Sequence, residues 1–225
     1  MDNHAKIGDS IIYRNNQLLA FNKPATTPSV PQPGEVKSLL ELGEIYSKKK
    51  LYAIHRLDRP ASGVLLFAKN TDALEHLNQQ FRNRTVEKTY LALVKQAPNP
   101  KQGTLHHFLQ KQKKGNKSIA LAEANEETKE ALMDYEIVGQ SENFHLLQIK
   151  LQTGRHHQIR AQLAAIGSPI RGDNKYGYKR GNRDRSIQLH AWKLRFDHPI
   201  SGDRETVVAP PPADPVWNPF VSFFQ

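Results

Sequence analysis

Short β-prone runs bounded by turn-forming residues recur along the chain, and helices do not separate them one by one. The runs lie at residues 11–13, 18–21, 64–68, 89–94, 131–137, 144–152, 187–196 and 204–208. Helical spacing of apolar residues is confined to the segments 38–50, 71–84 and 153–165. Since a doubly wound fold needs a helix after nearly every strand, this pattern predicts an α+β fold with a largely antiparallel mixed sheet and flanking helices and loops.

Turn-forming residues divide these runs. The tetrad at 14–17 predicts a hairpin between the first two runs, and the four prolines of segment 24–34 predict a loop. Segment 98–125 has little apolar periodicity and several lysines, so we expect an exposed excursion with short strands there, not a domain boundary. The 225 residues suit one domain or a compact pair of sub-domains. We expect residues 1–225 to form a single domain.

The chain is strongly basic. Its 32 lysines and arginines exceed its 22 aspartates and glutamates, for a formal net charge of +10. Such a surplus favours a polyanionic partner, because neutralising phosphates releases condensed counterions; a merely solvated basic surface is the alternative. No apolar run approaches the roughly 18 residues that a membrane span needs, and segment 1–6 lacks the apolar core of a secretory signal. We expect no membrane association and a cytoplasmic location.

Three polar segments beside apolar runs carry the candidate chemistry. The first, His55-Arg56-Leu57-Asp58-Arg59-Pro60-Ala61-Ser62-Gly63, places one carboxylate between two arginines. A neighbouring guanidinium lowers the pKa of an aspartate, so Asp58 should stay ionised. An ionised carboxylate can act as a nucleophile or as a base. A surface salt bridge beside a turn is the alternative reading. The chain has no cysteine, which excludes a thiol nucleophile.

The second segment, 152–160, combines a glycine with cationic and amide side chains. Arg155 and Arg160 lie five positions apart, so on a helix they cannot point the same way; one can serve the chemistry while the other makes a structural contact. The adjacent His156 and His157 would diverge on a helix and have no carboxylate at ligand spacing. We therefore predict no metal site.

The third segment, 87–94, is a β-prone run that contains a single tyrosine, Tyr90. From spacing alone, Tyr90 would be a core or half-buried residue. Nothing in this segment by itself points to chemistry.

Residues 55–63 closely resemble the signature H-R-L-D-x-x-[TS]-S-G of the RluA-type RNA pseudouridine synthases. Other segments resemble the remaining motifs of that family in the same order, at 18–25, 88–92, 153–160, 167–173, 176–177, 189–191, 198–199 and 209–210. Together the motifs span about residues 11–217. Two positions depart from the family pattern: Ala61 stands where threonine or serine is usual, and His156 where threonine is common.

The resemblance implies the pseudouridine synthase catalytic fold with a central RNA-binding cleft, and an enzyme that isomerises specific uridines of structured RNA to pseudouridine. It implies that Asp58 attacks a flipped-out uridine, at the base or at the sugar C1′, that Tyr90 lies against the base, and that Arg155 pairs with Asp58. No cofactor is implied, since the isomerisation involves no net redox change and no added group. Because the chain begins close to the first motif, we expect no separate N-terminal RNA-binding domain.

The resemblance also predicts how the substrate is bound. Arg56 would fill the gap that the flipped uridine leaves in the RNA. The remaining substrate-binding candidates are His55, Leu57, Ile159 and Leu189. Phosphate contacts are expected from the lysines of segment 95–117 and from segment 48–50. The expected partner is a stem-loop of ribosomal or transfer RNA, and the expected protein is a monomer.

Two other functions remain open from the sequence. A non-catalytic RNA-binding or ribosome-assembly protein on the same fold would keep the basic surface without needing Asp58, Tyr90 and Arg155. A hydrolase acting on glycosidic bonds would need a second carboxylate, roughly 5–10 Å from the first. Asp173 is the only candidate for that second carboxylate within the motif segments.

Overall fold

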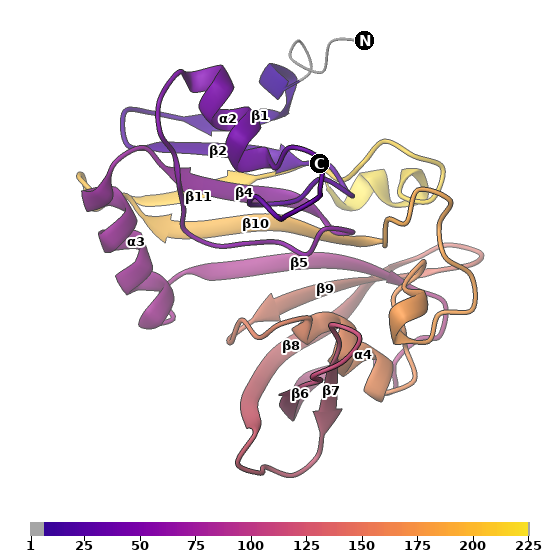
Figure 1. Cartoon of the computed structure of the whole chain (residues 1–225). Coiled ribbons are helices and arrows are strands. Elements are labelled where there is room, and N and C mark those ends of the chain that lie inside the picture. The colour runs from indigo at the N-terminus through magenta and orange to yellow at the C-terminus, as the bar shows by residue number, and fades with distance from the viewer. Residues whose placement is uncertain (1–6, 225) are drawn as a thin grey trace. The chain divides into compact units, whose positions relative to one another are not determined.

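The computed structural model describes residues 7–224, which divide into two compact units (Figure 1). The first unit comprises residues 7–88 and 191–211, and the second comprises residues 89–190 and 212–224. Segment 1–6, in which we found no secretory signal, lies outside the described residues. The single domain expected from the chain length stays a prediction.

The first unit is a sheet with two α-helices. Its elements are the 3-10 turn η1 (Gly8–Ser10), helices α2 (Leu39–Ser47) and α3 (Thr71–Arg82), and strands β1 (Ile11–Arg14), β2 (Leu18–Lys23), β3 (Tyr52–Ala53), β4 (Ser62–Ala68), β10 (Leu189–Asp197) and β11 (Arg204–Val208). Across the sheet the order is β1-β2-β4-β10, with β11 on β10 and β3 on β4. The predicted hairpin between β1 and β2 is present, and Asn15 closes its turn by accepting the Leu18 N–H at 2.7 Å.

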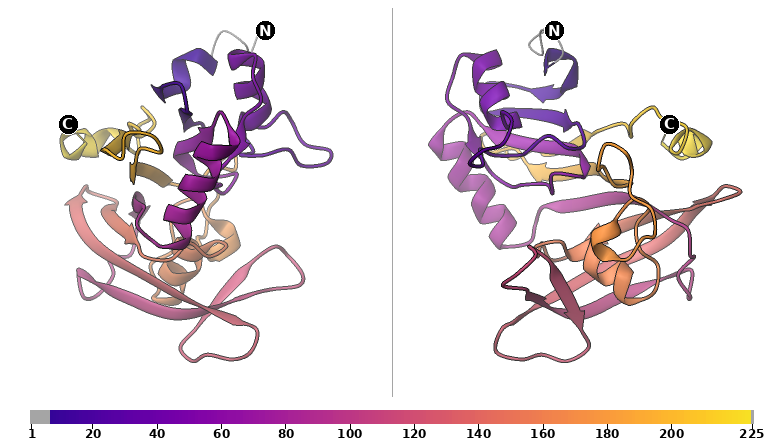
Figure 2. Two further views of the ribbon diagram at one scale, coloured as in Figure 1. Left: turned by 90° about the vertical axis from the view of Figure 1, so that its left-hand side faces the viewer. Right: turned by 45° about the vertical axis from the view of Figure 1, so that its right-hand side comes forward.

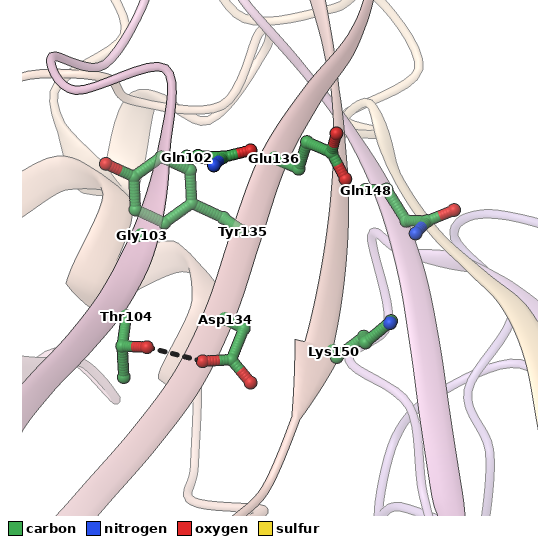
Figure 3. Close-up of a pocket in the computed structure, with 8 residues that line it drawn as sticks. All are labelled: Gln102, Gly103, Thr104, Asp134, Tyr135, Glu136, Gln148 and Lys150. Carbon is green, nitrogen blue, oxygen red and sulfur yellow. Dashed lines mark hydrogen bonds between the residues drawn. The ribbon is translucent and has the colours of Figure 1, made fainter.

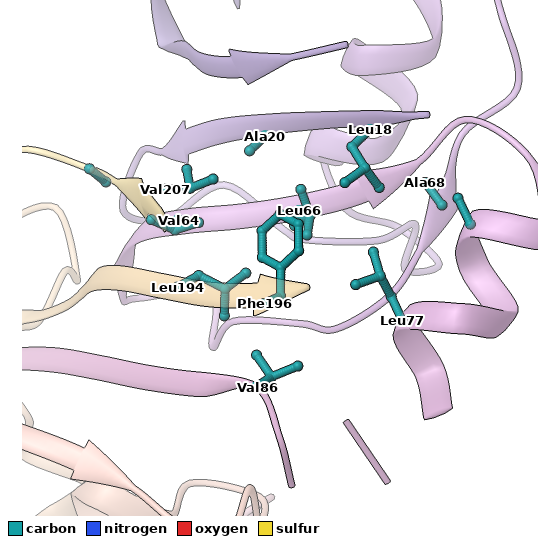
Figure 4. Close-up of a cluster of buried hydrophobic side chains, with 12 residues drawn as sticks. Leu18, Ala20, Val64, Leu66, Ala68, Leu77, Val86, Leu194, Phe196 and Val207 are labelled. Atoms are coloured by element: carbon teal, nitrogen blue, oxygen red, sulfur yellow. The ribbon is translucent and has the colours of Figure 1, made fainter. Parts of the chain in front are cut away.

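Strand β4 is buried along its whole length, because apolar groups cover both faces of the sheet. On one face, a single cluster joins the sheet to α3 (Figure 4) and consists of Leu18, Ala20, Val64, Leu66, Ala68, Ala73, Leu77, Val86, Leu194, Phe196, Val207 and Ala209. On the other face, the Phe67 and Phe21 rings meet edge to face at 6.0 Å. Helix α2 approaches these rings at Gly43, where a Cβ would lie 3.2 Å from Phe21. The apolar run 64–68 therefore forms a core strand rather than an alternating one.

Both helices of the first unit begin at polar caps. Ser38 and Glu41 form a reciprocal capping box at the start of α2. Asn70, not the predicted Thr71 or Asp72, caps α3, because its extended backbone lets Oδ1 accept the Ala73 N–H at 2.8 Å. The two helices thus lie where the sequence predicts them, over slightly shorter spans.

The second unit is a sheet packed on one short helix. Its elements are strands β5 (Glu87–Val94), β6 (Gln102–Lys111), β7 (Ser118–Leu121), β8 (Thr128–Gln140) and β9 (His145–Leu151), helix α4 (Gln158–Ala165), and the 3-10 turns η2 (Asn174–Tyr176) and η3 (Asn218–Phe223). The strand order is β5-β9-β8-β6-β7. The views of Figure 2 show how strongly β6 and β8 twist. Helix α4 contributes Ala161 to a buried cluster with Leu109, Ala131 and Tyr176.

Two predictions about this unit are corrected. Segment 98–125 contains β6, a strand of 10 residues that pairs with β8 along most of its length, so it belongs to the sheet. Its apolar periodicity is weak because most of its side chains are at least partly exposed. The helix predicted over 153–165 begins only at Gln158. Thr153 N still bonds to Leu132 O of β8 at 3.3 Å, and His157 has a left-handed φ of 55°.

The predicted α+β class with an antiparallel mixed sheet is confirmed. Within residues 7–224, no helix has the length and apolar character needed to cross a membrane.

Candidate active site

Asp58 lies on the loop 54–61, between β3 and β4, and backbone contacts fix this loop. The Ala61 N–H donates to the Asp58 carbonyl at 3.1 Å and closes a turn. The buried Ser29 hydroxyl donates to Leu57 O at 2.8 Å and accepts from Leu57 N at 3.1 Å. The residue before Asp58 is therefore held on both sides, which fixes the direction in which the half-buried Asp58 side chain leaves the chain.

Lys23, at the end of β2, is a fully buried lysine beside this loop. Its ammonium donates hydrogen bonds to three backbone carbonyls, those of Pro24 at 3.0 Å, Thr27 at 2.9 Å and Arg59 at 3.2 Å. Burial lowers the pKa of Lys23 to about 7, and the Asp58 carboxylate opposes this shift. Lys23 thus ties two loops together within electrostatic range of Asp58. In the sequence, Lys23 is a lone lysine at the end of an apolar strand run, and that pattern alone does not mark it as part of a site.

His55 is held against the sheet of the first unit. Its Nε2 accepts the Leu66 N–H at 3.1 Å, and its ring stacks on Phe81 with centroids 5.4 Å apart. Burial lowers the pKa of His55 from 6.5 to about 4, and the Lys88 ammonium acts in the same direction. His55 is therefore neutral at neutral pH, and its observed contacts brace the loop that carries Asp58.

The two arginines that flank Asp58 differ in their surroundings. The Arg59 guanidinium forms an ion pair with Glu35, and its Nε donates to Thr26 O at 3.0 Å, so it fastens the proline-rich loop to the Asp58 loop. Arg56 is exposed. An exposed guanidinium two residues from Asp58 suits the predicted contact with RNA better than a structural role.

In the second unit, Tyr90 lies in a strand, and Arg155 lies in the segment between β9 and α4. Tyr90 is half-buried in β5, as its spacing predicts. Arg155 precedes α4; its N–H donates to Gln158 Oε1 at 3.0 Å, and its Nε donates to Glu130 O at 2.9 Å. The Arg155 side chain is therefore bound to the backbone of β8, and the residue is half-buried.

Arg160 and Asp173 form a buried ion pair in the second unit. The Arg160 guanidinium donates from Nε to Asp173 Oδ2 at 2.6 Å and from a terminal nitrogen to Oδ1 at 2.9 Å, and both side chains are at least 95% buried. The guanidinium also lies 4.9 Å from the centre of the Tyr176 ring. Of the two arginines in the second motif segment, Arg160 is thus the buried and bidentate one, and Arg155 contacts a backbone carbonyl.

The adjacent histidines do not diverge, because they precede the helix. The His156 and His157 rings stack at 3.8 Å. His156 Nδ1 contacts Ser118 Oγ at 2.9 Å, and His157 Nδ1 contacts Tyr176 Oη at 3.0 Å. Burial strongly lowers the pKa of His157, and Arg160 and His156 add to the effect. No group of three potential metal ligands occurs within the described part of the chain.

The predicted site residues belong to both units, and each is placed within its own unit. The first unit holds His55, Arg56, Leu57 and Asp58. The second holds Tyr90, Arg155, Ile159 and Leu189, because the division between the units falls within β10, between His190 and Ala191. The apolar candidates Leu57, Ile159 and Leu189 are buried.

A family model for RNA pseudouridylate synthases matches residues 17–165, which include the Asp58 loop, Tyr90 and Arg155. The chain belongs to the RNA pseudouridylate synthase family. It is 32% identical over 213 residues to the uncharacterized RNA pseudouridine synthase YlyB of Bacillus subtilis, and the match covers 91% of this chain and 69% of YlyB. It is also 32% identical over 228 residues to the ribosomal large subunit pseudouridine synthase C of Yersinia pestis, covering 93% of this chain and 68% of that protein. The RluA-type resemblance is confirmed.

Solved structures agree on the fold. The human RNA pseudouridylate synthase domain containing 1 aligns with a TM-score of 0.76 at 27% identity, over 92% of this chain and 85% of that one. The human RNA pseudouridylate synthase domain containing 4 has the same TM-score of 0.76 at 22% identity, over 93% and 91% of the two chains, and shows the shared fold alone. The protein is accordingly an RNA pseudouridine synthase, and a purely non-catalytic role is disfavoured.

The geometry of this pseudouridine synthase also weighs against a glycosidic hydrolase. Asp173, the only candidate for a second catalytic carboxylate, has both oxygens engaged by Arg160. With both oxygens bound to a guanidinium in a buried pair, this carboxylate is not available to contact a glycosidic bond, as such hydrolysis needs.

A cavity of about 360 Å³ lies on the second unit of this synthase, between β6, β8 and β9 (Figure 3). Asp134 lies within it, accepting from the Thr104 hydroxyl at 2.6 Å and from Gln152 Nε2 at 2.9 Å. None of the predicted catalytic or substrate-binding residues lines this cavity. It is therefore not a candidate for the uridine site.

Proposed function

We propose that this pseudouridine synthase isomerises specific uridines in structured RNA, with Asp58 as the nucleophile on a flipped-out uridine. The observation that carries the proposal is the placement of Asp58 on an anchored loop within range of the buried Lys23 ammonium. A fixed loop lowers the entropy cost of attack by the carboxylate.

The reaction needs no external reagent. Asp58 attacks the uridine at the base or at C1′, the bond between the sugar and the base nitrogen breaks, and the uracil rotates and rejoins the sugar through carbon; the bond to Asp58 then breaks and regenerates the carboxylate. A proton leaves that carbon and the nitrogen regains one, so atoms and electrons balance within the substrate. Extruding the uridine from its stack costs a few kcal/mol. The exposed Arg56 beside Asp58 is suited to fill the space that the base leaves.

We assign Tyr90 and Arg155 to the same reaction, as the family resemblance implies, with Tyr90 against the base and Arg155 as the partner of Asp58. The other arginine of this segment, Arg160, is engaged by Asp173 in a buried bidentate pair and therefore suits the structural role, whereas Arg155 Nε donates to a backbone carbonyl. A lysine cannot reproduce a bidentate guanidinium contact. Arg155→Lys should therefore lower kcat at unchanged fold, whereas Arg160→Lys should lower the free energy of unfolding; a fall in kcat at unchanged fold for Arg160→Lys alone would refute the assignment of Arg155.

The RNA substrate is proposed to be ribosomal or transfer RNA presenting a stem-loop. The names of two relatives, the ribosomal large subunit pseudouridine synthases of Yersinia pestis and Borreliella burgdorferi, support ribosomal RNA first. A monomeric state, action without a cofactor and a cytoplasmic location are parts of the same proposal.

The test is pseudouridine mapping at single-nucleotide resolution on total RNA from a strain that lacks the gene and carries either wild type, Asp58→Asn or Asp72→Asn. Asp58→Asn keeps the size of the side chain but removes the nucleophilic carboxylate, so sites restored by wild type should stay unmodified. Asp72 is exposed on α3 and serves as the control. Restoration by Asp58→Asn would refute the assignment of the nucleophile. Failure of purified wild type to modify either ribosomal or transfer RNA from that strain would refute the proposed substrates.

A further inference from the structure

We propose that the loop 178–186 and the tip of the β6–β7 hairpin, residues 112–117, form one surface of the second unit that binds RNA phosphates. This inference rests on the proposed function, which supplies RNA as the substrate. It goes further by naming the surface that holds the backbone, which includes a loop that the sequence motifs do not mark.

The loop 178–186 concentrates exposed positive charge. Its four cations are Lys179, Arg180, Arg183 and Arg185, and all four side chains are exposed. Its single carboxylate belongs to Asp184, whose Oδ1 accepts from the Ser186 N–H at 3.0 Å and from the Ser186 hydroxyl at 2.7 Å. The acidic group is therefore used to fold the loop, and the cations are presented to solvent.

Hydrogen bonds fix the backbone of this loop. Asn182 Nδ2 donates to Ser186 O at 2.9 Å and to Gln188 Oε1 at 3.0 Å, while its Oδ1 accepts from Arg171 at 3.0 Å. At Gly181 the chain passes so close to Asn174 that a Cβ would lie 2.2 Å from Oδ1. Since the backbone is already ordered, binding an anion here costs mainly side-chain entropy.

The β6–β7 hairpin tip joins this loop through η2. The Lys175 ammonium donates to the carbonyls of Gly115 at 3.2 Å and Asn116 at 3.3 Å. The Lys117 ammonium lies 5.0 Å from the centre of the Tyr176 ring, so the tip is held on both sides of its turn. Exposed Lys113 and Lys114 extend the positive surface from the loop onto the tip.

A second observation supports a positive potential at this edge of the unit. Among the charges that lower the pKa of the partly buried His157 are Lys175, in η2 before the loop, and Lys111, the last residue of β6 before the hairpin tip. Three of the four loop cations are arginines, whose planar guanidinium matches a phosphate with two parallel hydrogen bonds. The partner that these groups fit is a row of phosphates. Each phosphate carries one negative charge, and neutralising it releases condensed counterions, which favours binding.

The salt dependence of RNA affinity tests this surface. We would replace Lys179, Arg180, Arg183 and Arg185 together with glutamine, leaving intact the residues that fold the loop. The control replaces four exposed cations elsewhere, Lys37, Arg82, Lys129 and Lys150, with glutamine. A second control changes only the three loop arginines to lysine, which keeps the charge. All are made on an Asp58→Asn background, so that the RNA is bound without being converted.

The dissociation constant for a transcript of large-subunit ribosomal RNA is measured by filter binding between about 50 and 200 mM salt. Each lost phosphate contact lowers the slope of log Kd against log salt by about 0.7 on single strands and about 0.9 on a DNA duplex, so losing four contacts should lower it by about 3–4. Over that fourfold salt range, wild-type binding should therefore weaken about a hundredfold more than binding by the glutamine variant. Both controls should keep the wild-type slope.

An unchanged slope in the loop variant, with its circular dichroism and thermal unfolding like those of wild type, would overturn the proposal. So would an equal loss of slope in the four-residue control.

The two proposals fail separately. If wild type forms no pseudouridine but the loop variant loses its slope, the surface stands and the catalytic proposal falls. If the mapped sites depend on Asp58 while the loop variant binds like wild type, the reverse holds.

Discussion

Acid should destabilise the first unit through His55, and the size of the effect follows from its surroundings. Nε2 accepts the Leu66 N–H, so protonating this nitrogen would replace the acceptor with a second donor and break the hydrogen bond. The pKa of His55 falls from 6.5 to about 4 on folding. Between those values the unfolded chain binds more protons than the folded one, so the free energy of unfolding decreases as the pH falls. The contribution is fully present above pH 6.5 and lost near pH 4, and it amounts to about 3 kcal/mol.

The matched variant is His55→Gln, because a glutamine oxygen can accept the same Leu66 N–H without titrating. The chain has two tryptophans, Trp192 in the first unit and Trp217 in the second, so a Trp217→Phe background lets fluorescence report on the first unit alone. Urea unfolding is followed at several pH values, in that background, with and without His55→Gln.

Above pH 6.5 the variant should be less stable than the parent, because glutamine cannot stack on Phe81, and its stability should depend less on pH than that of the parent. The difference between the two proteins should shrink by about 3 kcal/mol between pH 6.5 and pH 4. Parallel pH profiles for the two proteins would show that His55 titrates normally in the folded state, and that its burial does not govern its charge.

Three further substitutions have expected outcomes. Gly63→Ala should leave no folded first unit by circular dichroism, since φ is +114° and a Cβ would lie 2.2 Å from the Ala191 carbonyl oxygen. Asp173→Asn should lower the free energy of urea unfolding, followed by Trp217, by about 3–5 kcal/mol, because it leaves the buried Arg160 charge unpaired. Lys23→Met should lower the free energy of urea unfolding by at least about 2 kcal/mol, followed by Trp192, because three backbone carbonyls lose their donor. A loss below about 1 kcal/mol in either of the last two variants would contradict the structural role of the replaced residue.

The sequence by itself determined the elements that depend on local pattern. The apolar run 64–68, the turn at 14–17 and the helices near 39–47 and 71–82 follow from spacing and turn chemistry, which act between residues close in the chain. The signature around Asp58 and the motifs that follow it identified the family before any fold was known.

Only the tertiary structure decided which polar groups work together. Ser29 holds the residue before Asp58, Lys23 ties that loop to another, and Arg160 is paired with Asp173. The start of α4 and the long strand β6 were likewise set by bonds to β8, not by local spacing. These contacts join segments far apart in the sequence, and their energies arise from burial and from hydrogen bonds made on folding. The local sequence pattern cannot predict either of these. The role of Lys23, for example, follows only from its hydrogen bonds to three backbone carbonyls in the folded structure.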